Sequence, residues 1–140
     1  MGRQAAREVR ILTAYLLDTH AAIWWWTSDP RLGAAAADVI VADVDTIYLS
    51  AASVWEVAIK SSAGKLPEIV DFENEYEPLM RANRFTRLTI TDAHALRSGF
   101  LPGTHRNPFD RLIAAQALIE DLTVITRDPE IAGFGCKVLW

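Results

Sequence analysis

Short apolar runs alternate with longer amphipathic segments along most of the chain. Each run is rich in β-branched, aromatic or leucine residues and is bounded by polar or turn-forming residues, which is typical of β-strands. The pattern predicts strands at Tyr15–Leu17, Thr46–Leu49, Arg87–Ile90, Thr123–Thr126 and Lys137–Leu139, the last of them at an edge. The segments between these strands are long enough for helices, which favours parallel pairing.

The intervening segments carry the start and stop signals of helices. They predict a helix that ends at Trp26 after a Thr19 cap, and helices over Leu32–Ala42, Ala51–Ser62, Asp71–Asn83, Asp92–Ser98 and Pro108–Glu120. Ser50, Thr91 and Asn107 are the expected N-caps of three of them, and the apolar helix Leu32–Ala42 is expected to be well buried. Strands that alternate with helices predict an α/β fold, a three-layer α/β/α sandwich with a mostly parallel central sheet.

Four carboxylates fall near the ends of the predicted strands. Asp18 and Asp128 follow the first and fourth strands, Glu56 lies on the helix after the second strand, and Asp110 lies just inside another helix. In a parallel α/β sheet the strand C-termini and the following helix N-termini share one edge, where ligands bind. Acids that gather there need a divalent cation to offset their repulsion. The spacing therefore predicts a metal-dependent hydrolase.

Each of these acids also has a purely structural interpretation. Asp18 could be a turn residue, and Asp128 could be a helix cap before a first-position proline. Asn107 and Asp110 fit the two ends of a capping box. Glu56 has a lysine four residues on, a pair that commonly decorates a solvent-exposed helix face. Capping and catalysis are compatible, because an acid at a helix N-terminus is both a cap and a preorganised ligand.

Composition is consistent with one compact domain over residues 15–140, preceded by an N-terminal extension over residues 1–14. The content of 51% hydrophobic and 23% charged residues is that of a globular protein. No apolar run approaches the ~20 residues that span a bilayer, so no membrane association is expected. The first dozen residues lack the pattern of a secretory signal. The single Cys136 is expected to be a buried hydrophobe and suits a cytoplasmic location.

The net charge of −4 argues against an open, non-specific nucleic-acid surface. It leaves a nuclease possible, because bound cations reverse the local charge of a carboxylate site. Other polar residues are weaker candidates: Thr126 could hydrogen-bond a ligand at the same edge or be structural, and His94 and His105 have no spaced partner.

Four local motifs point to a specific family. They are Leu17–Trp24, Leu49–Lys60 with its continuation Gly64–Leu66, His105–Ala117, and Val124–Asp128. In this order they resemble the motifs of PIN-domain toxins, the VapC family of type II toxin–antitoxin systems. The resemblance spans nearly the whole folded chain.

The resemblance implies an endoribonuclease that depends on Mg²⁺ or Mn²⁺, acts on RNA, forms a homodimer and is inhibited by a small cognate antitoxin. The acidic site of the family maps to Asp18, Glu56, Asp110 and Asp128 here. Asp18 and Asp110 are the expected direct metal ligands, and Glu56 and Asp128 would complete the site directly or through water. Asn107 stands where the family usually has an acid, which bears on metal stoichiometry.

Three consecutive tryptophans, Trp24 to Trp26, form a separate feature. Successive helical residues point about 100° apart, so one buried face cannot cover all three. Trp24 is expected in the core, and Trp25 or Trp26 at an exposed apolar patch for a partner. The alternative is a helix buried on several sides.

Two other classes of protein share parts of this pattern. A phosphoacceptor signalling domain also has acids at the C-terminal edge of its sheet, but it needs a pair of acids after the first strand, and Asp18–Thr19 lacks the pair. A catalytically silent interaction module would keep the fold alone, and the retention of all four acids counts against it.

Overall fold

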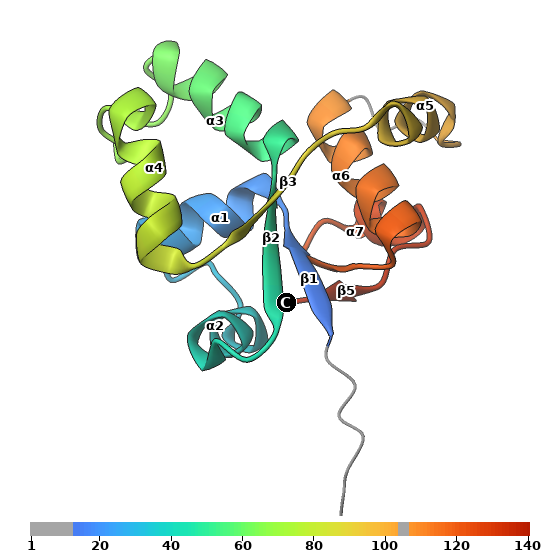
Figure 1. Cartoon of the computed structure of the whole chain (residues 1–140), viewed down its shortest axis with the longest axis horizontal. Helices are drawn as coiled ribbons and strands as arrows, with labels where there is room; N and C mark the ends of the chain where they lie inside the picture. Colours follow the sequence, from blue (N-terminus) through green and yellow to red (C-terminus); the bar gives the residue numbers. More distant parts are fainter. Residues whose placement is uncertain (1–12, 104–106) are drawn as a thin grey trace, which may run out of the picture.

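The central sheet of the computed structural model contains five parallel strands in the order β3-β2-β1-β4-β5 (Figure 1). The structure describes residues 13–103 and 107–140. The strands are β1 Ala14–Leu17, β2 Thr46–Ser50, β3 Thr86–Leu88, β4 Thr123–Ile125 and β5 Val138–Leu139. Most of the proposed N-terminal extension, together with His105 and Arg106 of the third motif, lies outside the described residues.

Seven helices of the described residues cover the two faces of this sheet. They are α1 Thr19–Trp26, α2 Ala34–Ala42, α3 Ala51–Ser62, α4 Phe72–Asn83, α5 Asp92–Phe100, α6 Pro108–Glu120 and α7 Pro129–Gly133. Figure 1 shows α1, α2 and α4 on one side of the strands and α5, α6 and α7 on the other. The prediction of a three-layer α/β/α sandwich is confirmed. Among the described residues, no helix has both the length and the apolar character to cross a membrane.

The central strand β1 is buried on both faces, as parallel strands between two helical layers are. Leu16 belongs to the apolar cluster under α6, and Leu17 belongs to the cluster under α1, α2 and α4. Both side chains are fully buried, and their alternation follows the two-residue period of a strand. A third cluster around Trp24 and Val57 fills the space between α1, α3 and α4. Because of this packing, the loops at the C-terminal ends of the strands are held by rigid elements.

Two local expectations are corrected by the structure. Asp18, and not Thr19, is the N-cap of α1, because its carboxylate accepts a hydrogen bond from the Ala21 amide at 2.7 Å. The helix α2 begins at Ala34 and buries only Ala36 and Ile40. It lies at the outside of its layer, so its apolar composition did not indicate full burial.

The expectation for the tryptophan triplet is partly wrong. Trp24 is buried, as expected. The indole nitrogen of Trp25 donates to Asn83 Oδ1 at 2.7 Å, and Trp26 packs against Phe72 with ring centroids 6.1 Å apart. Both lie partly buried against the apolar clusters, since α4 covers this side of α1. The most exposed aromatic side chain of the described residues is instead that of Phe100, on α5.

Candidate active site

A cleft of about 620 Å³ opens where β1 and β4 end. Three of the four predicted acids line it, each from a different element. Asp18 joins β1 to α1, Asp110 lies in the first turn of α6, and Asp128 precedes α7. Because β1 and β4 are parallel neighbours, their C-terminal ends lie side by side. The structure therefore brings these three carboxylates to one cavity.

Asp18 is 6% exposed, which is unusual for a carboxylate. Burial raises its pKa from the ordinary value of 3.8, while hydrogen bonds from Thr126 and from the Ala21 amide oppose the rise. Its backbone amide also donates to the carbonyl of Ile125 at 3.1 Å, which ties the end of β1 to β4. The side chain is thus fixed in place, and its ionised form is costly unless a positive charge approaches.

Asp128 and Asp110 are both half-buried at helix N-termini. Asp128 caps α7 by accepting from the Glu130 amide at 2.9 Å, as its sequence context predicts. The backbone amide of Asp128 donates to Thr126 Oγ1 at 3.0 Å, so Thr126 connects it to Asp18. At the start of α6, the side chain of Asn107 accepts from the amides of the next turn, including that of Asp110 at 3.4 Å. Asn107 is the predicted cap.

Glu56 is not among the residues that line the cleft, but Lys60, its partner, is. The carboxylate is 3% exposed, so the expectation of a solvent-facing pair does not hold. Its Oε2 accepts from Lys60 Nζ at 2.8 Å. Its Oε1 is buried and has no hydrogen-bond partner in the described part of the chain. An unpaired buried carboxylate oxygen costs about 1–3 kcal/mol or more, and a cation or its bound water would remove that cost.

These observations fit a divalent cation without forming a complete site for one. Within residues 13–103 and 107–140, no three His, Cys, Asp or Glu side chains converge closely enough to hold a metal ion. The donors at the cleft are carboxylate oxygens, which are hard ligands and suit Mg²⁺ or Mn²⁺ better than Zn²⁺.

Part of the cleft lining, here called the aromatic wall, is aromatic and basic, which the sequence did not indicate. Trp24 and Trp140 line it together with Arg31 and Arg127. The two rings meet edge to face at 5.7 Å. His20 also lines the cleft, with its ring 5.4 Å from that of Trp24. Trp140 is more than 100 positions from Trp24, so no local pattern could pair the two.

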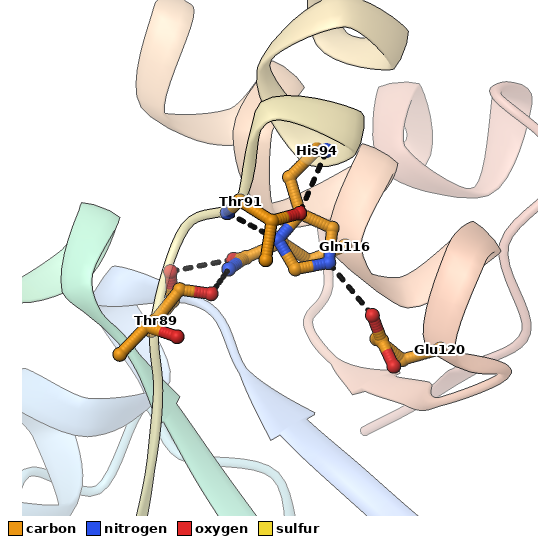
Figure 2. A network of polar contacts seen from close by, with 6 residues as sticks. Thr89, Thr91, His94, Gln116 and Glu120 are labelled. Atoms are coloured by element: carbon orange, nitrogen blue, oxygen red, sulfur yellow. Dashed lines mark hydrogen bonds and ion pairs between the residues drawn. The ribbon is translucent and has the colours of Figure 1, made fainter.

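A second polar cluster, the α6 network, lies outside the cleft lining and was also missed (Figure 2). It consists of Ser50, Thr89, Thr91, His94, Gln116 and Glu120. Ser50 Oγ donates to Gln116 Oε1 at 2.5 Å while accepting from the Ala52 amide, and Gln116 Nε2 donates to the Thr89 carbonyl at 3.2 Å. Ser50 and Gln116 are fully buried. This contact joins the start of α3, which carries Glu56, to α6.

The other half of the α6 network explains His94 (Figure 2). Its Nδ1 accepts from the Thr91 amide at 3.0 Å, and Thr91 Oγ1 accepts in return from the His94 amide, which forms a capping box on α5. Nδ1 therefore carries no proton, and Nε2–H points to Glu120 Oε2 at 2.8 Å. The imidazole is 1% exposed and has a structural role.

The protein is an α/β domain in which a five-stranded parallel sheet lies between two layers of helices. Carboxylates from three elements share a cleft at the C-terminal edge of this sheet. The sequence matches the PIN domain over residues 15–135, and the chain belongs to that family.

Individual relatives agree with the family assignment. The chain is 28% identical over 120 residues to ribonuclease VapC22 of Mycobacterium tuberculosis (strain ATCC 25618 / H37Rv), covering 84% of this chain and 88% of the relative. Its fold is similar to chains in crystal structures of DNA-bound VapBC from Salmonella typhimurium, with a TM-score of 0.67, 17% identity and coverage of 92% and 98%. It is also similar to FitAcB from Neisseria gonorrhoeae, with a TM-score of 0.64, 22% identity and coverage of 90% and 96%.

Proposed function

We propose that this protein is the toxin of a type II toxin–antitoxin system and a metal-dependent endoribonuclease that hydrolyses RNA phosphodiester bonds in the cytoplasm. The observation that carries the proposal is the cleft shared by Asp18, Asp110 and Asp128 at the C-terminal edge of the sheet. Membership of the PIN family and similarity to a ribonuclease over most of both chains support the same reaction.

Asp18 and Asp110 are the residues that we propose to hold Mg²⁺ or Mn²⁺ directly, with Glu56 and Asp128 completing the site directly or through water. The buried, unpaired Oε1 of Glu56 and the raised pKa of Asp18, caused by its burial, support a positive charge at this place. When bound, such an ion lowers the pKa of a coordinated water and neutralises charge on the phosphate.

The chain itself preorganises the acids for this role. Asp18 and Asp128 are each fixed by capping a helix, and Thr126 hydrogen-bonds to both residues. A carboxylate that is already oriented needs little rearrangement when substrate arrives, which is the main source of electrostatic catalysis. Lys60, at the cleft, is paired to Glu56 and screens the charge of that acid.

The test is cleavage of single-stranded and structured RNA by the purified protein with Mg²⁺ or Mn²⁺. We expect EDTA to abolish cleavage, and Asp18→Asn and Asp110→Asn each to lose nearly all activity while remaining folded by circular dichroism. The matched control is Asp38→Asn, because Asp38 is an exposed acid on α2 that does not line the cleft. Parental activity in either site variant would remove that residue from the proposed metal site.

We further propose that the protein forms a homodimer and binds a small cognate antitoxin. Exposed apolar side chains on two helices that both contact α6 support a partner surface there: Trp55 (55% exposed) and Ile59 on α3, and Leu96 and Phe100 (84% exposed) on α5. Exposed aromatic side chains of this kind are enriched among residues that dominate binding energy.

Trp55→Ser tests the partner surface. Its ring contacts Phe109 edge to face at 5.0 Å but is mostly exposed, so the free energy of unfolding should change little. Loss of a dominant interface aromatic costs roughly 2 kcal/mol, about thirtyfold in affinity. Sedimentation velocity measures self-association, with Val41→Ser on α2 as the control for an exposed apolar side chain. Unchanged self-association would place the dimer interface elsewhere.

A further inference from the structure

Arg127 comes directly before the cap residue Asp128 and lies against the aromatic wall of the cleft. Its guanidinium carbon is 4.5 Å from the ring centroid of Trp24 and 5.9 Å from that of Trp140. Both distances are those of cation–π contacts. An arginine held between two rings loses much of its side-chain freedom before any ligand arrives, so less entropy is lost on binding.

The two rings are themselves held in place by the fold. Trp24 is 6% exposed. Trp140 packs directly over Gly33, where an added Cβ would lie 2.5 Å from the Trp140 carbonyl carbon and 2.6 Å from its Cδ1. Any side chain at position 33 would therefore push Trp140 away. Gly33 thus allows the close approach that places the second ring beside Arg127.

The other basic groups at this cleft are already paired with acids. Arg31, also over the Trp24 ring at 4.8 Å, makes two side-chain hydrogen bonds to Asp29, at 3.1 and 2.7 Å. Lys60 is paired with Glu56. Within the described part of the chain, the guanidinium of Arg127 contacts aromatic rings and forms no close ion pair with an acid, so its N–H donors remain available to a ligand. Arg127 is exposed and able to meet a ligand.

Arg127 shares the cleft with the three acids and also lies near Asp29. The pKa of Asp29 is lowered to about 2, mainly by hydrogen bonds from Arg31 and to a smaller extent by the charge of Arg127. The charge of Arg127 is therefore close enough to Asp29 to act on it, but its ring contacts are with Trp24 and Trp140. A strand whose scissile phosphate lay at the three acids would bring its neighbouring phosphates to other residues of the same cleft, and Arg127 is one of these.

We propose that Arg127, held by Trp24 and Trp140, binds a backbone phosphate of RNA next to the scissile one. A planar guanidinium donates two parallel hydrogen bonds to phosphate oxygens, and the two indoles hold it in place for that contact. The subsite would hold the strand in register over the acids in a protein whose net charge of −4 otherwise repels RNA. This inference rests on the proposed ribonuclease function.

The experiment separates binding from chemistry. A fluorescent single-stranded RNA oligonucleotide is titrated with the full-length Asp110→Asn protein, alone and combined with Arg127→Gln, and anisotropy is measured at several salt concentrations. We expect Arg127→Gln to bind roughly tenfold more weakly, the loss of one charged hydrogen-bonding group. The slope of log K against log[salt] should fall by about 0.7, the value for one phosphate contact to a single strand.

The matched control is Arg84→Gln, which removes the same charge from an exposed arginine that pairs with Asp43 away from the cleft. It should leave both affinity and slope within error of the parent. Gly33→Ala changes no charge, and it should weaken binding by displacing Trp140. In the active background, Arg127→Gln should raise KM with little change in kcat, because a remote phosphate contact is made equally in the ground and transition states.

The outcomes distinguish this subsite from the reaction itself. If Arg127→Gln binds RNA with the affinity and salt slope of the parent, and the unmodified protein cleaves RNA, the subsite is overturned. The ribonuclease proposal then still stands. Equal weakening by Arg84→Gln would also overturn it, because the effect would then be one of net charge. Failure of the unmodified protein to bind or cleave any RNA would overturn both. If Arg127→Gln is misfolded, Arg127→Lys is measured instead. It should keep the salt dependence of RNA binding, because the charge remains, and should bind RNA more weakly.

Discussion

The acidic cleft and the α6 network both bury polar side chains, yet they pair them differently. In the α6 network, Ser50 and Gln116 are fully buried and bonded to each other. Among the predicted site acids, Glu56 keeps one buried oxygen without a partner among the described residues, and burial raises the pKa of Asp18 in the cleft. A buried network whose polar groups are all paired stabilises the fold, whereas a buried carboxylate oxygen without a partner has a free lone pair that can bind a cation or its water. The comparison predicts that mutations in the two regions will change stability with opposite signs.

The largest stability effect should come from Gln116→Leu. The substitution removes the partner of the buried Ser50 hydroxyl and the donor to Thr89, and we expect a loss of about 3 kcal/mol. Urea unfolding measures it. In a double-mutant cycle with Ser50→Ala, the combined loss should be smaller than the sum of the two single losses, because both break the same bond. Additive losses would show that the bond is unimportant.

Binding of a divalent cation should produce the next largest effect, and only at the cleft. A ligand at a hundredfold excess over its Kd stabilises the folded state by about 2.7 kcal/mol. Mg²⁺ or Mn²⁺ should therefore raise the Tm of the parent and of Gln116→Leu, and raise that of Asp110→Asn much less. Thermal melts with and without the ion decide this. Equal shifts in the parent and in Asp110→Asn would exclude Asp110 from the site.

The sequence predicted local features at the cleft but not the long-range contacts of the α6 network. The caps by Ser50, Asn107 and Asp128 were predicted correctly, because each hydrogen bond spans two or three residues. The convergence of acids followed from the parallel topology, which places all strand ends at one edge. Ser50 and Gln116 are 66 positions apart, and nothing in either segment marks the other as its partner.

Long-range packing likewise explains the errors and omissions. Trp25 or Trp26 was expected at an exposed patch because the helix was considered alone, whereas Asn83 contacts Trp25 and Phe72 contacts Trp26. The aromatic wall around Arg127 was missed since it depends on Trp140 fitting over Gly33. Sequence patterns describe one element and its neighbours along the chain. They do not indicate which distant element will cover it.

Asp18→Asn in metal-free protein with EDTA tests whether a mutation at the cleft changes stability in the opposite direction from one in the α6 network. The folded-state pKa of Asp18 is raised, so its contribution to stability is fully present below its ordinary value of 3.8 and is lost as the pH rises through the raised value. Above that range the burial of Asp18 costs stability relative to the unfolded chain, and Asn caps a helix about as well as Asp. The variant should be as stable as the parent or more stable at pH 7, with any advantage disappearing near pH 4. A clear loss at pH 7 would assign Asp18 to structure alone.

The smallest effect should come from Glu120→Gln, at the outer end of the α6 network. Its carboxylate accepts from His94 Nε2, but the side chain is 43% exposed, so water can replace it. Partly exposed pairs contribute roughly 0.5 kcal/mol, and the amide oxygen of Gln can still accept from the imidazole N–H. Urea unfolding at pH 7 should place the variant within that margin of the parent. A loss of stability as large as that of Gln116→Leu would mean that the exposed contact between His94 and Glu120 contributes as much as the buried ones. Solvent exposure would then not predict which contacts of the α6 network are strong.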